Sequence, residues 1–141
     1  MSAPLGLRRI ASVPLAALLG LLMLGVFGSA ASAQERWAAI APNQEDTSNV
    51  VWATSKDQAK KLAVLACKEV SKTCAETPAS TNGMDHVFAI MCCDSPAKAC
   101  AAGVGDGRAG ALKEVKSVLS DGGYSQCTLK SYFKAGTGEK G

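Results

Sequence analysis

Apolar residues occur along the chain in short runs that predict strands, and each pair of runs is followed by a helical pattern. Runs at residues 37–41 and 50–54 predict two strands. Ser55 and Gln58 then have the spacing of a capping box, in which two side chains satisfy backbone donors at a helix start. Residues 37–70 are therefore expected to form a strand–strand–helix unit.

The helix expected after Ser55 is amphipathic. Its apolar positions share one face, and because several of them are alanines we expect close packing on a sheet. The residues of this face are Ala59, Leu62, Ala63, Ala66, Cys67 and Val70. The opposite face is expected to be solvated, and it carries Lys56, Lys60, Lys61, Lys68 and Glu69.

The second half of the chain has the same order of patterns. Strands are predicted at residues 87–93 and 99–104, followed by a helix at 108–120. A further strand is expected at 127–133, and another short one at 75–78, between the halves. The inward face of the second helix is expected to consist of Ala109, Leu112, Val115 and Leu119.

An internal repeat accounts for this order. A shift of 50 residues lays 37–74 over 87–124 without a gap and places Ser117 at the position of Cys67. The identical pairs are Ala39/Ala89, Ile40/Ile90, Ala59/Ala109 and Leu62/Leu112. We therefore expect an α+β fold, an antiparallel sheet with two helices on one face, built from two β-β-α(-β) pseudo-repeats and stabilised by disulfides.

The N-terminal segment has the features of a secretory signal peptide. Arg8 and Arg9 precede an apolar run at 13–27, and Ala31-Ser32-Ala33 forms a small-residue cleavage site before Gln34. A transmembrane anchor is the alternative, but about 15 apolar residues are fewer than the roughly 20 needed to span a bilayer. Residues 1–33 are therefore expected to be removed.

Cleavage changes the size and the charge of the working protein. Of the 141 residues, 108 remain, and because Arg8 and Arg9 are lost with no acid, the formal net charge falls from +3 to +1. This length suits one domain, which we expect at 34–134, followed by a disordered glycine-rich tail at 135–141. Near neutrality, the bulk charge gives no reason to expect nucleic-acid binding.

The chain has six cysteines, all in the part that follows the signal peptide. An even number behind a secretory signal predicts disulfides, whereas zinc is disfavoured because there is no C-x2-C pair and His86 is the only histidine. A four-residue turn at 95–98 would place two cysteines opposite each other, and shared strand faces suggest a second pair. The expected pairs are Cys93 with Cys100, Cys92 with Cys127, and Cys67 with Cys74.

A glycine-rich stretch matches a binding motif but has a simpler interpretation. Gly105, Gly107 and Gly110 match a dinucleotide-binding motif, but the expected hairpin lacks the parallel unit that the motif requires, so we expect a glycine turn with Asp106 as a candidate helix cap. An anion held at this helix start near Arg108 is a second alternative.

The sequence gives no set of residues that would form a hydrolase active site. His86 and Cys92 lie six residues apart on one strand, about 20 Å, and cannot meet. A serine-type hydrolase would need a histidine with an orienting acid, and the sequence indicates no such set. We expect His86 to lie at a solvated strand entrance, and we expect no catalytic, metal or cofactor site.

The mature region resembles a family of small secreted bacterial proteins that is known only as a domain of unknown function. The resemblance rests on Trp37-Ala-Ala-Ile40-Ala and on the spacing of Ala59, Ala63 and Cys67, and it covers most of residues 36–133. The family implies no established activity, cofactor or catalytic residue.

These observations favour a noncatalytic periplasmic or extracellular domain that binds a protein or an envelope component, or acts as an inhibitor. The alternative is an envelope hydrolase with unidentified catalytic residues. We expect no nucleic-acid partner and no stable membrane span after signal cleavage.

Overall fold

The computed structural model describes residues 35–141, so the expected signal peptide and its cleavage site lie outside the described residues. These residues form a single unit. Its elements are β1 (Trp37–Ile40), β2 (Val51–Ala53), α1 (Lys56–Val70), β3 (Ala79–Thr81), β4 (Val87–Ser95), β5 (Ala99–Gly105), α2 (Arg108–Asp121) and β6 (Ser125–Lys134). The short strand expected at 75–78 begins at Ala79 instead.

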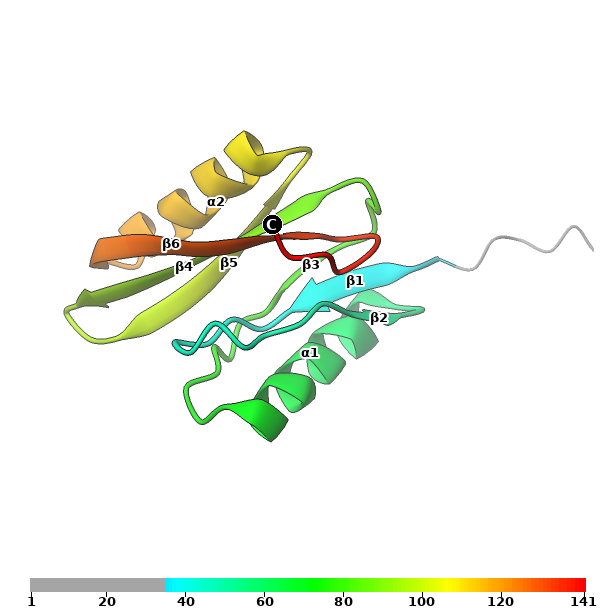
Figure 1. Ribbon diagram of the computed structural model, residues 1–141, viewed down its shortest axis with the longest axis horizontal. Coiled ribbons are helices and arrows are strands. Elements are labelled where there is room, and N and C mark those ends of the chain that lie inside the picture. The colour runs from blue at the N-terminus through cyan, green and yellow to red at the C-terminus, as the bar shows by residue number, and fades with distance from the viewer. Residues whose placement is uncertain (1–34) are drawn as a thin grey trace, which may run out of the picture. The chain divides into compact units, whose positions relative to one another are not determined.

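The strands form two antiparallel three-stranded sheets, with the orders β2-β1-β3 and β5-β4-β6. The sheets face each other, with α1 on the outer side of the first and α2 on the outer side of the second (Figure 1). The α+β class is as expected. The prediction of one sheet with both helices on one face is wrong, because each helix covers its own sheet.

The central strands β1 and β4 explain the layered arrangement because both are buried on both faces. Ala38 of β1 and Phe88 of β4 lie in the core between the sheets, whereas the adjacent Ala39 and Ala89 pack against α1 and α2. A helix covers only one face of such a strand, and here the other face packs against the second sheet. The buried core between the sheets contains Ala38, Ile40, Val50, Phe88, Ile90, Phe133 and Ala135.

The start of α1 is capped much as the sequence predicts. Ser55 is the N-cap, and its hydroxyl accepts a 3.3 Å hydrogen bond from the backbone N–H of Gln58. The side chain of Gln58 accepts a bond from the hydroxyl of Thr54 at 3.1 Å. One half of the expected capping box is therefore present.

The buried stripe of α1 is narrower than expected. It consists of Ala59, Ala63 and Cys67, four residues apart, which lets the helix lie close to the first sheet. Leu62, expected on this face, is exposed, as is Val70. These side chains therefore contribute to the surface.

Helix α2 buries Ala111, Val115 and Leu119, whereas Ala109, expected to face inward, is exposed. The gap-free alignment of residues 37–74 with 87–124 also disagrees with the strand registers. Trp37 pairs with Ala53 in the first sheet and Val87 pairs with Gly105 in the second, so the first strands differ by 50 positions but the second strands by 52. The same shift of 52 places Leu119, rather than Ser117, at the position of Cys67.

The six cysteines form three disulfides. Cys67–Cys74 is confirmed, but the other two expected pairs are wrong, because the bonds join Cys92 to Cys100 and Cys93 to Cys127. The strand register explains the exchange. Cys92 lies opposite Cys100 of β5, while Cys93 lies opposite Cys127 of β6. The expected hairpin was one residue out of register.

The C-terminal segment 135–141 folds back on β6, so the prediction of a disordered tail is wrong and the domain extends to Gly141. The backbone N–H of Tyr132 donates to Gly141 at 3.1 Å, and that of Lys134 donates to Glu139 at 2.9 Å. Gly138 adopts a left-handed φ of 72°, which permits the reversal.

Candidate functional site

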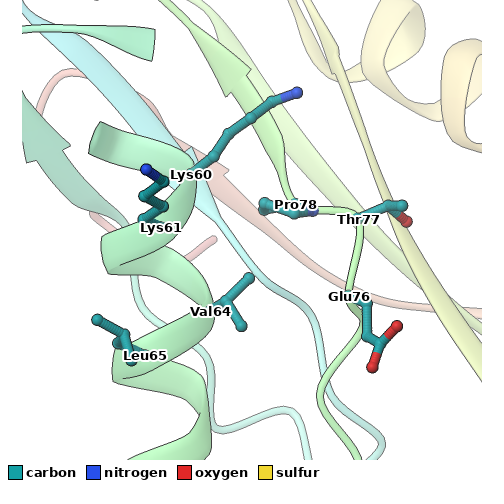
Figure 2. A pocket seen from close by; sticks show the side chains of 7 residues that line it. All are labelled: Lys60, Lys61, Val64, Leu65, Glu76, Thr77 and Pro78. Atoms are coloured by element: carbon teal, nitrogen blue, oxygen red, sulfur yellow. The ribbon is translucent and has the colours of Figure 1, made fainter. Parts of the chain in front are cut away.

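A surface hollow of about 540 Å³ lies between α1 and the segment 76–78. Figure 2 shows Val64 extending from α1 toward the segment that holds Pro78, with Lys60 above them. Leu65 lines the same hollow and is 59% exposed. A concave site lined by apolar side chains with a few polar groups beside them is a candidate binding site.

The rim of this hollow carries charge of both signs. Lys60 and Lys61 lie on α1, and Glu76 lies on the facing segment. The lysines belong to the helix face that we expected to be solvated. Their position beside apolar side chains makes the rim suited to a ligand with acidic and apolar groups.

A second crevice, of about 280 Å³, shares Lys60, Thr77 and Pro78 with the first hollow. It continues along β3 to the edge strand β5 and to Glu114 and Val118 of α2. We define the side face as the surface formed by the segment 76–80, β5, Glu114 and Val118 of α2, and the α1 residues Lys56, Lys60, Lys61, Val64 and Leu65. The side face crosses both halves of the domain, and it includes one edge strand of each sheet, β3 and β5.

A third hollow, of about 420 Å³, adjoins the side face at Glu76 and Thr77. Gln44 and Lys98 also line it. The side-chain nitrogen of Gln44 is buried without a hydrogen-bond partner, although Gln44 as a whole is half-buried. The segment 74–80 therefore borders all three hollows.

Covalent and polar contacts fix the segment that leads into the side face. Cys74 is bonded to Cys67 of α1, and the backbone N–H of Ala75 donates to Pro42 at 2.8 Å. These contacts hold the entry to the segment 76–80 against both α1 and the connection that follows β1. The side face is therefore built on a fixed element rather than on a free loop.

A carboxylate on the same connection strengthens this attachment. The carboxylate of Glu45 accepts hydrogen bonds from the hydroxyls of Thr73 and Ser71, at 2.6 and 2.7 Å. These bonds, that of Thr73 first, hold the pKa of Glu45 below its ordinary value because they stabilise the charged form.

The structure brings His86 together with two residues that the sequence analysis did not connect with it. The Nδ1 atom of His86 lies 2.6 Å from the hydroxyl of Thr81, and its Nε2 atom lies 3.1 Å from the carboxylate of Asp106. No motif spacing links these three positions, so sequence reasoning missed them. The order hydroxyl–imidazole–carboxylate is that of a hydrolase triad, but the ring is reversed, because in the triad the hydroxyl faces Nε2 and the carboxylate faces Nδ1.

The surroundings of these residues favour a structural role. Thr81 is only 6% exposed, and its hydroxyl also accepts the backbone N–H of Gly83 at 3.0 Å. The ring of His86 lies against Gly83, where an added Cβ would approach it to 2.5 Å. Thr81, His86 and Asp106 line none of the hollows described above. The histidine therefore fastens the turn before β4.

The glycine-rich stretch also has a packing role. The N-cap of α2 is Gly107, with no side-chain hydrogen bond, so the expectation that Asp106 caps this helix is wrong. Gly105 lies so close to α2 that an added Cβ would come within 2.6 Å of the backbone nitrogen of Ala111. Arg108 stacks over the ring of Tyr132, 5.0 Å from its centroid. Glycine here permits close contact between strand and helix.

Within residues 35–141, no group of three or more His, Cys, Asp or Glu side chains is arranged to hold a metal ion. Neither of the two helices described combines the length and the apolar content that a membrane span requires. Compared with models of protein families, curated proteins and solved structures, the chain has no significant match.

Proposed function

We propose that this protein is a noncatalytic binding domain that works outside the cytoplasm and recognises a protein or envelope component through its side face. The observation that carries the proposal is the hollow between α1 and the segment 76–78. Exposed Leu65 lies there beside Lys60 and Lys61, on an element tied down by the Cys67–Cys74 bond. Such an exposed apolar site on a rigid support favours binding.

The three disulfides indicate an oxidising, extracytoplasmic environment. A periplasmic or extracellular location, reached through the predicted signal peptide, is part of the proposal. So is membership of the secreted family that the sequence resembles.

We also propose that the two halves are pseudo-repeats. In both sheets the first strand of the half is the central strand. From the second strand of each half onward, equivalent residues in the strand pairs differ by a constant 52 positions. Each helix supplies three buried residues spaced four apart. The side face lies where the two halves meet and includes one edge strand of each sheet, β3 and β5.

An envelope hydrolase is the second candidate, and the line of Thr81, His86 and Asp106 is the observation that favours it. Catalysis would require the hydroxyl of Thr81 to become accessible to a substrate. A stably folded His86→Ala protein that loses a measured envelope-hydrolysing activity would support the hydrolase.

Capture experiments with the secreted protein test the binding proposal. Wild-type protein, Leu65→Glu and the matched control Leu129→Glu would be immobilised and exposed to envelope extract. Leu129 is also an exposed leucine, but it lies on β6, away from the side face. We expect a stoichiometric partner with the wild type and with Leu129→Glu, and its loss with Leu65→Glu. Equal capture by all three folded proteins would contradict the role of the side face.

A further inference from the structure

Strand β5 has a free backbone edge. It pairs with β4 alone, because it stands at the end of its sheet. The backbone N–H of Val104 donates to the carboxylate of Glu114 at 2.8 Å, so it points away from β4. Strand backbone groups alternate in direction, and Ala102 and Cys100 therefore face the same free edge.

The spacing of Cys92 and Cys100 supports this orientation. Their Cα atoms are 4.1 Å apart, the close separation of opposed residues that do not exchange backbone hydrogen bonds. The hydrogen-bonding groups of Cys100 consequently point outward. Cys100 and Ala102 supply two N–H donors at this edge, and Glu114 occupies the third.

The other sheet edges are short or covered. β2 and β3 have three residues each. The outer edge of β6 carries Lys130 and Lys134, and the C-terminal segment pairs with it at Phe133. β5 has seven residues, Ala-Cys-Ala-Ala-Gly-Val-Gly, with no charge and no proline to block pairing. Proteins protect exposed edges by such devices, so an unprotected edge indicates a place for another strand.

The walls beside this edge define the side chains that a new strand would need. On the side of α2 lies Val118, which is 50% exposed, and on the side of α1 lie Lys56 and Lys60. Successive side chains of a strand point to opposite faces. A strand added at β5 would therefore direct alternate residues toward Val118 of α2, beside the bonded carboxylate of Glu114, and toward a cationic wall on the side of α1.

We propose that β5 binds an extended segment of a partner protein in which apolar and acidic residues alternate. The backbone of Ala102 and Cys100 supplies hydrogen bonds, as in other cases where a peptide adds to a sheet edge, and the two walls supply the sequence preference. This inference rests on the proposed function, because it names the partner chemistry that the side face selects.

Three synthetic nine-residue peptides test the proposal: alternating Val and Glu, alternating Val and Lys, and Val and Glu with a central proline. Fluorescence anisotropy measures affinity for the secreted protein, and hydrogen exchange measures protection of the amides of residues 100 and 102. We expect the Val–Glu peptide to bind at least about tenfold more tightly than the others and to slow exchange at both amides. Equal binding of the Val–Glu and Val–Lys peptides, or unchanged exchange, would overturn the proposal.

Variants of β5 and α2 give opposite expectations. Ala102→Pro removes an N–H that has no partner within the sheet, so the fold is retained while binding falls at least about tenfold. Glu114→Ala frees the Val104 N–H and removes a like charge, so binding tightens. If Ala102→Pro does not fold, Glu114→Ala and the exchange measurement still decide the matter. A folded Ala102→Pro protein that binds normally would refute strand addition.

A charge exchange tests the cationic wall. The double variant Lys56→Glu/Lys60→Glu should reverse the preference toward the Val–Lys peptide. The matched control Lys68→Glu/Lys72→Glu has the same charge change away from the crevice and should keep the wild-type preference.

A dimer of the free protein that Ala102→Pro dissociates would identify a second copy as the occupant and overturn the peptide proposal. If Leu65→Glu abolishes partner capture but Ala102→Pro does not, the binding function stands and strand addition fails.

Discussion

The indole N–H of Trp52 donates a 2.8 Å hydrogen bond to the carbonyl oxygen of Ala135. This bond joins an edge strand of the first sheet to the segment that follows the last strand of the second. Gly138 packs against the same indole ring, so the C-terminal reversal and Trp52 stabilise each other.

Trp52→Phe should lower the free energy of unfolding by about 1–2 kcal/mol, because it removes the bond and leaves the Ala135 carbonyl without a partner. Trp37→Phe is the matched control, since the indole N–H of Trp37 bonds only to the exposed carboxylate of Glu35, at 3.4 Å. Urea denaturation of both variants measures the difference. Equal effects would show that the Trp52–Ala135 bond contributes nothing specific.

The disulfides differ in the length of chain that they close. Cys93–Cys127 spans 34 residues and Cys92–Cys100 spans eight. Because longer loops lose more entropy on closure, replacing both cysteines of the longer bridge by alanine should cost about 1 kcal/mol more than replacing both of the shorter. Denaturation of the two double variants tests this, and peptide mapping with stepwise reduction tests the pairing. Recovery of Cys92 linked to Cys127 would contradict it.

His86→Ala should lower the free energy of unfolding by about 1–2 kcal/mol, because the bond to Thr81 and the packing on Gly83 are lost. Asp106→Asn should have little effect, since the Asp106 side chain is fully exposed. If the binding proposal holds, partner capture by both folded variants should equal that of the wild type. A selective loss of function in stably folded His86→Ala would favour the hydrolase.

Glu45 should contribute to the dependence of stability on pH. Its pKa in the folded protein is lowered from 4.5, first by the hydroxyl of Thr73 and then by that of Ser71. A lowered folded pKa gives stability that is present above the unfolded value and lost as the pH falls through the folded value. Glu45→Gln should therefore be less stable than the wild type at pH 7, and the difference should shrink below pH 4.5. A difference that does not change with pH would contradict this origin.

The element order could be predicted from the sequence because local patterns determine it. The apolar runs and the cap at Ser55 both act over a few residues. The run at 87–93 also contained a sign of the second sheet, since it is apolar without alternation, as strands buried on both faces are. Treating such a run as covered on one side led to the incorrect single sheet.

The register of β4 and β5 could not be predicted in this way, because it depends on how the connection at 94–98 folds. A slip of one residue moves every side chain to the other face, and it exchanged the partners of Cys92 and Cys93. The contact of His86 with Asp106 depends on how the turn before β4 lies against the end of β5. Neither the cysteine pairing nor the contact of His86 with Asp106 corresponds to a recognisable spacing in the sequence.

Each of the three disulfides closes within one half of the domain, so in residues 35–141 the peptide chain between Thr81 and Val87 is the sole covalent link between the halves. A protease that cuts there would release two separate chains. They would still share the apolar core between the sheets and the bond from Trp52 to Ala135. The domain is thus suited to fragment complementation, in which two separately made pieces reassemble into the native fold.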